Sequence, residues 1–332
     1  MAKKEIRAIA SADWHLSKRK DFNNLNRLKW SIRAGDLILD ICKKHKVPLL
    51  FAGDLFHTPK EVENPVVTVV NQQIYDHCEE NDIYAIPGNH DMSEKNTLNN
   101  RSPNYLDAFS MYPKFRQLFN EGAYHNSMYI YGVPYYDFQR DWLQAIHNAN
   151  DVVKGIKKKY HKILLLHGNA PGSVTPLGLE IESVLPQNLD DFFKDWDLVL
   201  FGHIHKPMKL SRKAYMLGSP AHQERSDEGC EMGYWEIYSD GSIKFIPLND
   251  ELPEFITMTA REFEQYDVAC PKACPDFITI VDDQPDTKEI EQEAGVYKAN
   301  SSRKLLAEMY CNETGIKDKK KIKALQKILS EI

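Results

Sequence analysis

Short apolar runs rich in β-branched and aromatic residues alternate with longer amphipathic stretches over most of the chain. Seven of these runs are predicted strands, at residues 6–11, 48–53, 83–88, 128–133, 162–167, 197–202 and 214–219. Residues 25–41 place apolar side chains at a helical period, although Gly35 weakens the middle of that helix. Strands that alternate with helices in this way predict a layered α/β domain.

The pattern changes near residue 249. Just before it, Asp240-Gly241 lies between two alternating runs, which predicts a type I′ hairpin and antiparallel strands at one end of the sheet. Residues 254–283 hold two more strand-like pieces, and residues 301–310 and 319–332 both have the apolar spacing of amphipathic helices. We therefore expect a main domain at 1–249, a small domain at 250–286 and a helical segment at 287–332.

Composition narrows the class of protein. The 332 residues carry a formal charge of −6, so no overall basic field indicates nucleic acid, and any polyanion site has to be local. The six cysteines contain no C-x-x-C pair and are expected to be free thiols. No apolar stretch is long enough for a signal peptide or a membrane span, so we expect a cytoplasmic protein without a membrane partner.

Side chains that can bind metal follow five of the predicted strands, directly after each strand ends. They are Asp13 and His15; Asp54 and His57; Asn89, His90 and Asp91; His167; and His203 and His205. Ligands gather at the carboxyl ends of strands in open α/β sheets, so we expect these loops to converge. The other histidines match no such strand end and are expected to be solvent-exposed or structural; they are His45, His77, His125, His147, His161 and His222.

The chemistry of this set points to hard or borderline divalent ions. Two carboxylates, one amide oxygen and four imidazoles suit manganese, iron, zinc or magnesium better than a soft thiolate metal. Seven such groups are too many for one ion. The set therefore predicts two divalent ions that share a bridging carboxylate.

In this order, D-x-H, G-D, G-N-H-D, H and G-H-x-H resemble the calcineurin-like metallophosphoesterase superfamily. Within it, the histidine three residues after the G-D aspartate, GHIHKP, and YMLGSP followed by SDEG and a hairpin resemble the nuclease subunit of the SbcC/SbcD type. That subunit is the counterpart of the meiotic-recombination nuclease, and this chain is similar to the compact versions that phages carry. The resemblance covers about residues 5–248. It implies an α/β fold: a two-layered β-sandwich flanked by helices, with a small C-terminal cap and a helical tail.

The resemblance also implies roles for individual residues. It implies that Asp13, His15 and His205 hold the first ion. Asn89, His167 and His203 would hold the second ion, and Asp54 would bridge the two ions. Manganese is the usual activating ion of the family. His90 follows a ligand asparagine, so it is placed to stabilise or protonate the leaving oxygen, with Asp91 as the residue that orients it. His57 would help to position the nucleotide for exonuclease action.

Substrate and partners are predicted from weaker signals. Two groups of basic residues follow metal-binding motifs: Lys18, Arg19 and Lys20, and Lys206, Lys209, Arg212 and Lys213. Their position beside the motifs favours binding of a DNA backbone. Ordinary surface charge explains either group alone equally well. By resemblance, the C-terminal helices would bind the coiled-coil base of an SbcC-like SMC-type ATPase. Helices within 62–81 and 102–119 would pair with a second copy of the chain into a homodimer. Packing in the core of a single chain explains the apolar residues at 62–81 equally well. Only residues 250–286 stand where the family carries a larger capping domain.

We expect a two-metal DNA phosphodiesterase, an exonuclease and single-strand endonuclease that works with the ATPase in DNA recombination and double-strand break processing. Two alternatives stay open: a phosphodiesterase that acts on small cyclic nucleotides, and a metal-stabilised scaffold without activity. Phosphoprotein phosphatases of the superfamily usually show G-D-x-x-D-R-G and G-N-H-E. GDLFH and GNHD stand here instead, which disfavours that substrate class.

Overall fold

The computed structural model describes residues 4–17, 27–58, 61–259, 262 and 277–281. Its strands are β1 (Ile6–Ser11), β2 (Leu49–Phe51), β3 (Ile83–Ala85), β4 (Phe115–Gln117), β5 (Glu121–His125), β6 (Met128–Val133), β7 (His161–His167), β8 (Leu198–Gly202), β9 (Met208–Lys209), β10 (Ala214–Met216), β11 (Gly233–Tyr238), β12 (Ile243–Pro247), β13 (Phe255–Thr259) and β14 (Phe277–Val281). Its helices are α1 (Arg27–His45), α2 (Asn64–Cys78), α3 (Gln139–Lys154) and α4 (Leu189–Phe192), with 3₁₀ helices η1 (Tyr105–Met111) and η2 (Arg225–Asp227).

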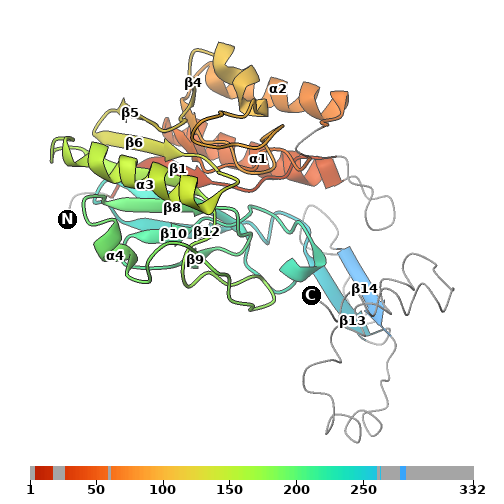
Figure 1. The fold of residues 1–332 in the computed structure, drawn as a ribbon. Helices are drawn as coiled ribbons and strands as arrows, with labels where there is room; N and C mark the ends of the chain where they lie inside the picture. The colour runs from red at the N-terminus through yellow and green to blue at the C-terminus, as the bar shows by residue number, and fades with distance from the viewer. Residues whose placement is uncertain (1–3, 18–26, 59–60, 260–261, 263–276, 282–332) are drawn as a thin grey trace, which may run out of the picture. The chain divides into compact units, whose positions relative to one another are not determined.

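Two mixed six-stranded sheets form the body of the fold (Figure 1). The first has the order β12-β11-β1-β2-β3-β4, and the second has the order β5-β6-β7-β8-β10-β9. Strands β1 to β4 run parallel to one another, as do β6, β7, β8 and β10. All seven predicted strands are confirmed, with β2, β3 and β10 ending earlier than predicted because their chains turn into loops.

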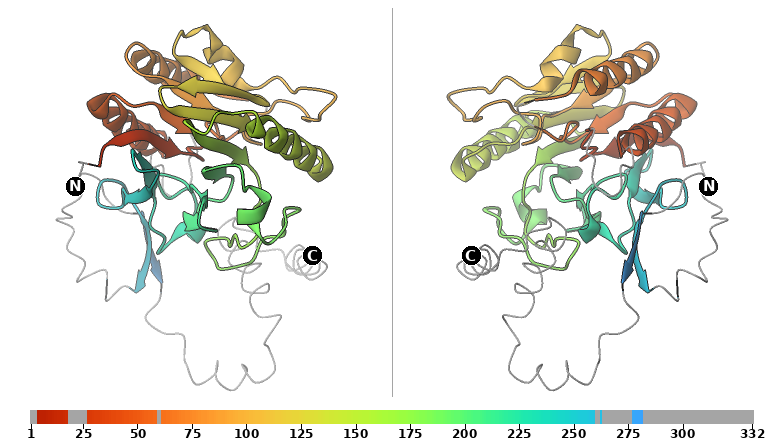
Figure 2. Two further views of the ribbon diagram at one scale, coloured as in Figure 1. Left: turned by 90° about the vertical axis from the view of Figure 1, so that its left-hand side faces the viewer. Right: turned by 90° about the vertical axis from the view of Figure 1, so that its right-hand side faces the viewer.

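Side chains alternate between the two faces of each strand, which divides the apolar residues among three cores. In β7, Ile163 and Leu165 pack between the two sheets, whereas Leu164 and Leu166 pack on the outer face with α3. The same alternation in β2 places Leu50 between the sheets and its neighbours against α1 and α2. Figure 2 shows α1 and α2 on one side of the strands and α3 on the other. The predicted two-layered β-sandwich flanked by helices is confirmed.

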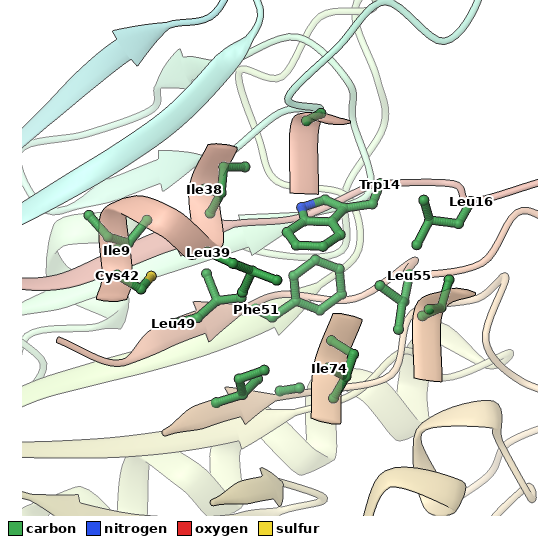
Figure 3. Close-up of a cluster of buried hydrophobic side chains, with 14 of the residues drawn as sticks. Ile9, Trp14, Leu16, Ile38, Leu39, Cys42, Leu49, Phe51, Leu55 and Ile74 are labelled. Carbon is green, nitrogen blue, oxygen red and sulfur yellow. The ribbon is translucent and has the colours of Figure 1, made fainter. Parts of the chain in front are cut away.

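Helix α1 contains the glycine that the sequence pattern disfavours. A Cβ atom on Gly35 would lie 2.7 Å from the Trp14 ring and 2.8 Å from Nε2 of Gln73, so only glycine lets α1 approach both. Trp14 is buried in the outer core of the first sheet, with its ring centroid 5.3 Å from that of Phe51 (Figure 3). Glycine lowers the stability of the helix at this position, but it allows α1 to pack closely beside the loop that carries Asp13.

One local prediction was wrong. The turn between β11 and β12 is not type I′, which needs positive φ at both central residues, because Gly241 has a φ of +80° while Asp240 is not in that region. Gly241 N–H donates to Tyr238 O and Tyr238 N–H donates to Ser242 O, so the loop is a three-residue turn closed by a left-handed glycine. The helix expected within residues 102–119 is the short 3₁₀ helix η1, which ends at Met111 because Tyr112 is extended before Pro113, and β4 follows it.

The chain divides into two units, 1–257 with 267–279, and 258–266 with 280–332. The second unit lies almost wholly outside the described residues. The predicted helical tail at 287–332 lies wholly outside them. The predicted strand-like pieces after residue 250 are confirmed as β13 and β14, which pair with each other. The domain boundaries at 249 and 286 stay predictions. Among the helices that the structure describes, none has the length and apolar character needed to cross a membrane.

Candidate metal centre

Loops from both sheets bring the predicted site residues together. The loops after β1 and β2 run side by side, since Asp13 N–H donates to Gly53 O at 2.9 Å and His15 N–H donates to Asp54 O at 3.1 Å. The loop after β8 joins them, because both carboxylate oxygens of Asp13 accept from the His203 N–H at 3.0 Å. Residues far apart in the sequence therefore meet at the carboxyl ends of parallel strands.

The backbone is strained at this point. Positive φ angles are uncommon outside glycine, yet Asp13 (57°), His15 (47°), Asp54 (58°) and His203 (105°) all have them. Three other non-glycine residues share that property in the described chain, and all three lie elsewhere. Such strain costs about 1–3 kcal/mol per residue and persists where a functional geometry requires it. The loops are thus shaped to aim these side chains.

Asp54 lies at the middle of the cluster. Its Oδ2 atom is 3.3 Å from Nε2 of His167 and 3.7 Å from Nε2 of His15, and both histidines are buried. Its Oδ1 atom accepts from the His90 N–H at 2.8 Å. One carboxylate oxygen is therefore near a histidine on each side, which is the arrangement that a bridging ligand requires.

The first group of donors comprises Asp13, His15 and Asp54, whose ligand atoms lie within 4.8 Å of one another. His205 adjoins this group, with its Nε2 atom 3.1 Å from Nε2 of His15. The Nδ1 atom of His15 is buried and has no hydrogen-bond partner among the described residues. These four side chains are the ones predicted for the first ion together with its bridge.

The second group comprises Asp54, His167 and His203, again within 4.8 Å. Asn89 adds its Oδ1 atom, which is 3.0 Å from Nε2 of His167 and 2.9 Å from Nδ1 of His203. The structure thus gathers all seven predicted ligands into two groups that share Asp54. Their roles as metal ligands stay predictions.

The donors in the second group fit a cation. His167 donates its Nδ1 hydrogen to Ala52 O at 2.7 Å, so Nε2 points a lone pair toward the oxygens of Asp54 and Asn89. Burial by itself would raise the pKa of Asp54, but His167 outweighs it and holds that pKa well below its usual value. Burial would lower the pKa of His167, yet Asp54 raises it to about 9. Electron pairs held this close need a cation among them, either a proton on His167 or a divalent ion that replaces it.

Glycine makes room for the cluster. A Cβ atom on Gly88 would lie 2.2 Å from Oδ1 of Asp54 and 2.6 Å from Cε1 of His167. A side chain at this position would therefore push the bridging carboxylate and a second-group histidine out of place.

His90 lies beside the first group. One nitrogen from each of His15, His57 and His90 lies within 4.8 Å of the others, and the rings of His57 and His90 stack with centroids 5.4 Å apart. Nδ1 of His90 contacts the backbone carbonyl oxygen of His57. A carbonyl can only accept, so Nδ1 carries the hydrogen and Nε2 is the atom that can exchange a proton.

Comparison with known proteins identifies this arrangement. A family described as calcineurin-like phosphoesterase matches residues 6–207, which is more than half of the chain and includes all seven predicted ligands. The chain belongs to the calcineurin-like phosphoesterase family. This family depends on two metal ions, in keeping with the two groups of donors. The chain is thus a metal-dependent phosphoesterase by family.

Other comparisons add little about the phosphoesterase. No curated protein matches its sequence. Among solved structures, phosphopantetheinyl hydrolase from Mycobacterium tuberculosis is similar over 64% of this chain and 87% of that one, with 12% sequence identity and a TM-score of 0.34. A likeness of that size says nothing about the substrate of the present chain.

Asp91 differs from its predicted role as the residue that orients His90. Its carboxylate accepts four backbone hydrogen bonds, while the His57 carbonyl holds His90. The donors, at 2.8–3.2 Å, are the N–H groups of Asp54, Leu55, Phe56 and Gly88. Asp91 is fully buried and ties the Asp54 loop of the phosphoesterase to the Asn89 loop. It positions the bridging carboxylate through the backbone.

Replacing Asp91 with alanine is expected to lower the free energy of unfolding by about 3 kcal/mol or more, because four buried N–H groups lose their acceptor. Urea denaturation followed by circular dichroism measures the change. Asp137→Ala is the matched control, since the exposed Asp137 accepts one backbone hydrogen bond, from Asn96 at 2.6 Å. Equal losses in the two variants would contradict the bracing role of Asp91.

Asp227 is a site residue that sequence reasoning missed. It is fully buried, and its Oδ2 atom is 3.8 Å from Nδ1 of His205. Burial would lower the pKa of His205, but Asp227 outweighs it and raises that pKa. Asp227 therefore stabilises the positive charge of a protonated His205 ring. The only sign of Asp227 in the sequence was its position in the SDEG stretch, and that stretch by itself did not indicate a role for the residue.

Some of the basic residues predicted to hold DNA also have partners within the protein. Arg212 pairs with Asp190 at 2.8 Å, and the Lys213 ammonium donates to backbone carbonyls, including that of Trp196 at 2.7 Å. Lys209 lies over the Tyr215 ring, and Lys206 is half-buried after His205. Residues 18–20 lie outside the described residues. Both Arg212 and Lys213 therefore have structural partners, which sequence order alone did not reveal.

Proposed function

We propose that this phosphoesterase is a two-metal DNA phosphodiesterase, an exonuclease and single-strand endonuclease that acts with an SbcC-like SMC-type ATPase in DNA recombination and double-strand break processing. The observation that carries the proposal is the position of Asp54. Its Oδ2 atom lies between the histidines of two donor groups, with His90 beside them. This position supports a phosphodiester-hydrolysing centre in which one side chain would serve both ions.

The residues divide the chemistry among them. When bound, two divalent ions, most suitably Mn²⁺, supply Lewis-acid stabilisation of the phosphate and a lowered pKa of water. Asp13, His15, His205 and Asp54 would hold one ion, and Asn89, His167, His203 and Asp54 the other. His90, whose Nδ1 hydrogen contacts the His57 carbonyl, delivers a proton from Nε2 to the leaving oxygen.

Support for DNA comes from the sequence of the site. His57 follows the G-D motif by three residues, as in the nuclease subunits that the chain resembles, and it stacks on His90. The half-buried Lys206 adds a cation next to His205.

The proposed homodimer would use α2 and η1. Side chains there expose apolar surface, with Val67, Val69 and Tyr75 at 39–45% exposure and Met111 at 74%. The remaining apolar residues of α2, Val66, Val70 and Ile74, are buried in the core. Core packing thus uses one face of the helix and leaves these other apolar side chains for pairing. The ATPase-binding segment would lie in 287–332, outside the described residues.

End-labelled linear DNA tests the proposal most directly. With Mn²⁺, the purified protein is expected to shorten single-stranded and duplex DNA, and the ATPase partner is expected to raise the rate. A cyclic nucleotide is incubated in parallel under the same conditions. Hydrolysis of the cyclic nucleotide without cleavage of DNA would show that the substrate is a small cyclic nucleotide and not DNA. No hydrolysis of either one would favour the scaffold.

A further inference from the structure

A short hairpin after β7 carries two exposed leucines at its tip. Its arms pair between Val174 and Glu180, and Leu177 and Leu179 are 71% and 64% exposed. Among the large apolar residues that the structure describes, only Met111 is more exposed than these two. Leucine gains free energy when it leaves water, so two exposed side chains at one tip indicate a surface that contacts another molecule.

Hydrogen bonds fix the shape of this tip. Gly178 N–H donates to Thr175 O at 2.8 Å, which closes a turn with Pro176 at its second position and a left-handed Gly178 (φ +79°) after Leu177. Thr175 N–H donates to Leu179 O at 2.8 Å, and Leu179 N–H donates to the Thr175 hydroxyl oxygen at 3.1 Å. The hairpin therefore holds both leucines in defined positions.

The two leucines lie beside the metal centre. Both line a cavity of about 280 Å³ whose wall also includes His203 and His205, predicted ligands of the two ions. Because the leucine side chains are open to solvent, a molecule in this cavity can reach them. A substrate whose phosphate lies at the donor groups would thus bring its neighbouring parts against the tip.

The chemistry of the tip suits a nucleobase better than a phosphate. The leucines are uncharged, and the exposed Glu224 on the same cavity wall would repel a phosphate. A base is uncharged, its faces are flat and apolar, and its amino groups can donate to a carboxylate. Glu180 alternates with Leu179 along the paired arm, so its carboxylate points to the opposite side of the hairpin.

We propose that the tip, residues 175–179, is a wedge that packs on the terminal base pair of a DNA duplex and unstacks it beside the metal centre. Leucine is among the apolar side chains that proteins insert between bases to unstack them. Contact with Leu177 and Leu179 would cover the base face that unstacking exposes, which offsets part of its cost. The proposal rests on the proposed function, because it assumes a DNA phosphate at Asp54.

A blunt duplex with 2-aminopurine in its terminal base pair tests the wedge without turnover. Phosphorothioate linkages at that end slow hydrolysis, and the emission of 2-aminopurine rises when the base loses its stacking neighbours. In Mn²⁺, the wild-type protein is expected to raise the emission. The double variant Leu177→Ser/Leu179→Ser is expected to lose this rise and to fold normally, since both side chains are exposed and outside the cores.

Two variants serve as controls. Leu177→Met/Leu179→Met keeps the tip apolar and is expected to keep the rise. Val152→Ser removes a 44% exposed apolar side chain from α3, away from the cavity wall, and is expected to behave as the wild type. No rise with the wild type, or an equal rise with the serine double variant, would overturn the wedge. An equal rise together with a lost dimer in light scattering would assign the leucines to a contact between copies.

Digestion of unmodified DNA separates the wedge from the proposed function. The serine double variant is expected to digest a blunt duplex at least about tenfold more slowly than the wild type. Its loss on single-stranded DNA is expected to be smaller, about twofold at most, because no base pair has to be unstacked. A wild-type emission rise that the serine variant loses, without digestion of either DNA, would refute the nuclease and retain the wedge. Equal digestion of the duplex by both proteins, with equal emission, would retain the nuclease and refute the wedge.

Discussion

Asp54→Asn is expected to lose at least about a thousandfold in the rate of phosphodiester hydrolysis, since the shared ligand contributes several kcal/mol of charge stabilisation through both ions. Asparagine preserves the shape of the side chain and retains an Oδ1 acceptor for the His90 N–H, which is 2.8 Å away. It removes the negative charge that His15 and His167 flank. The number of ions bound per chain is therefore expected to fall from two to at most one.

Hydrolysis assays and mass-spectrometric metal analysis of the dialysed protein measure both effects. Asp107→Asn provides a control, because Asp107 is a partly buried carboxylate that pairs with Arg101 and belongs to neither donor group. That variant is expected to retain both ions and full activity. A fully active Asp54→Asn protein with two ions would contradict the bridging role.

His90→Gln is expected to lower kcat by about 10²–10⁴-fold while it leaves the fold and the bound ions intact. His90 shares the His15 cluster, but its Nδ1 contacts a backbone carbonyl and it is absent from the two groups that contain Asp54. Glutamine can still form hydrogen bonds with a phosphate but cannot deliver a proton from Nε2. The loss is therefore expected in kcat more than in KM.

Steady-state kinetics on a DNA substrate, with metal analysis and thermal unfolding of the same samples, separates these outcomes. His147→Gln is the matched control, since His147 is an exposed histidine on α3 outside the donor groups. A His90→Gln variant that loses its ions would make His90 a ligand instead of a proton donor. A variant as active as the wild type would remove His90 from the chemistry.

The sequence predicted the fold well because its signals were local and repeated. Most of the apolar runs, each six residues long, ended in glycine or in a polar side chain, and the rule that ligands gather at strand ends then placed Asp54 near His167. The structure puts these two side chains 3.3 Å apart, although 113 residues separate them in the sequence. Periodicity and topology together were sufficient for that step.

Predictions failed where the partner of a side chain depends on exact loop geometry. Asp91 reads as a neighbour of His90 in the sequence, but its loop turns the carboxylate toward four backbone N–H groups. Sequence order also gave no sign that Arg212 pairs with Asp190 or that Lys213 donates to the carbonyls after α4. The hairpin turn likewise depends on the φ angle of Asp240, which composition cannot specify.

The central claim is that Asp54 serves two ions at once, and anomalous diffraction from a crystal grown with Mn²⁺ tests it most directly. The account predicts two anomalous peaks about 3.5–4 Å apart, one beside His15 and the other beside His167, with the Asp54 carboxylate bound to both. A single peak, or two peaks of which only one contacts Asp54, would contradict it.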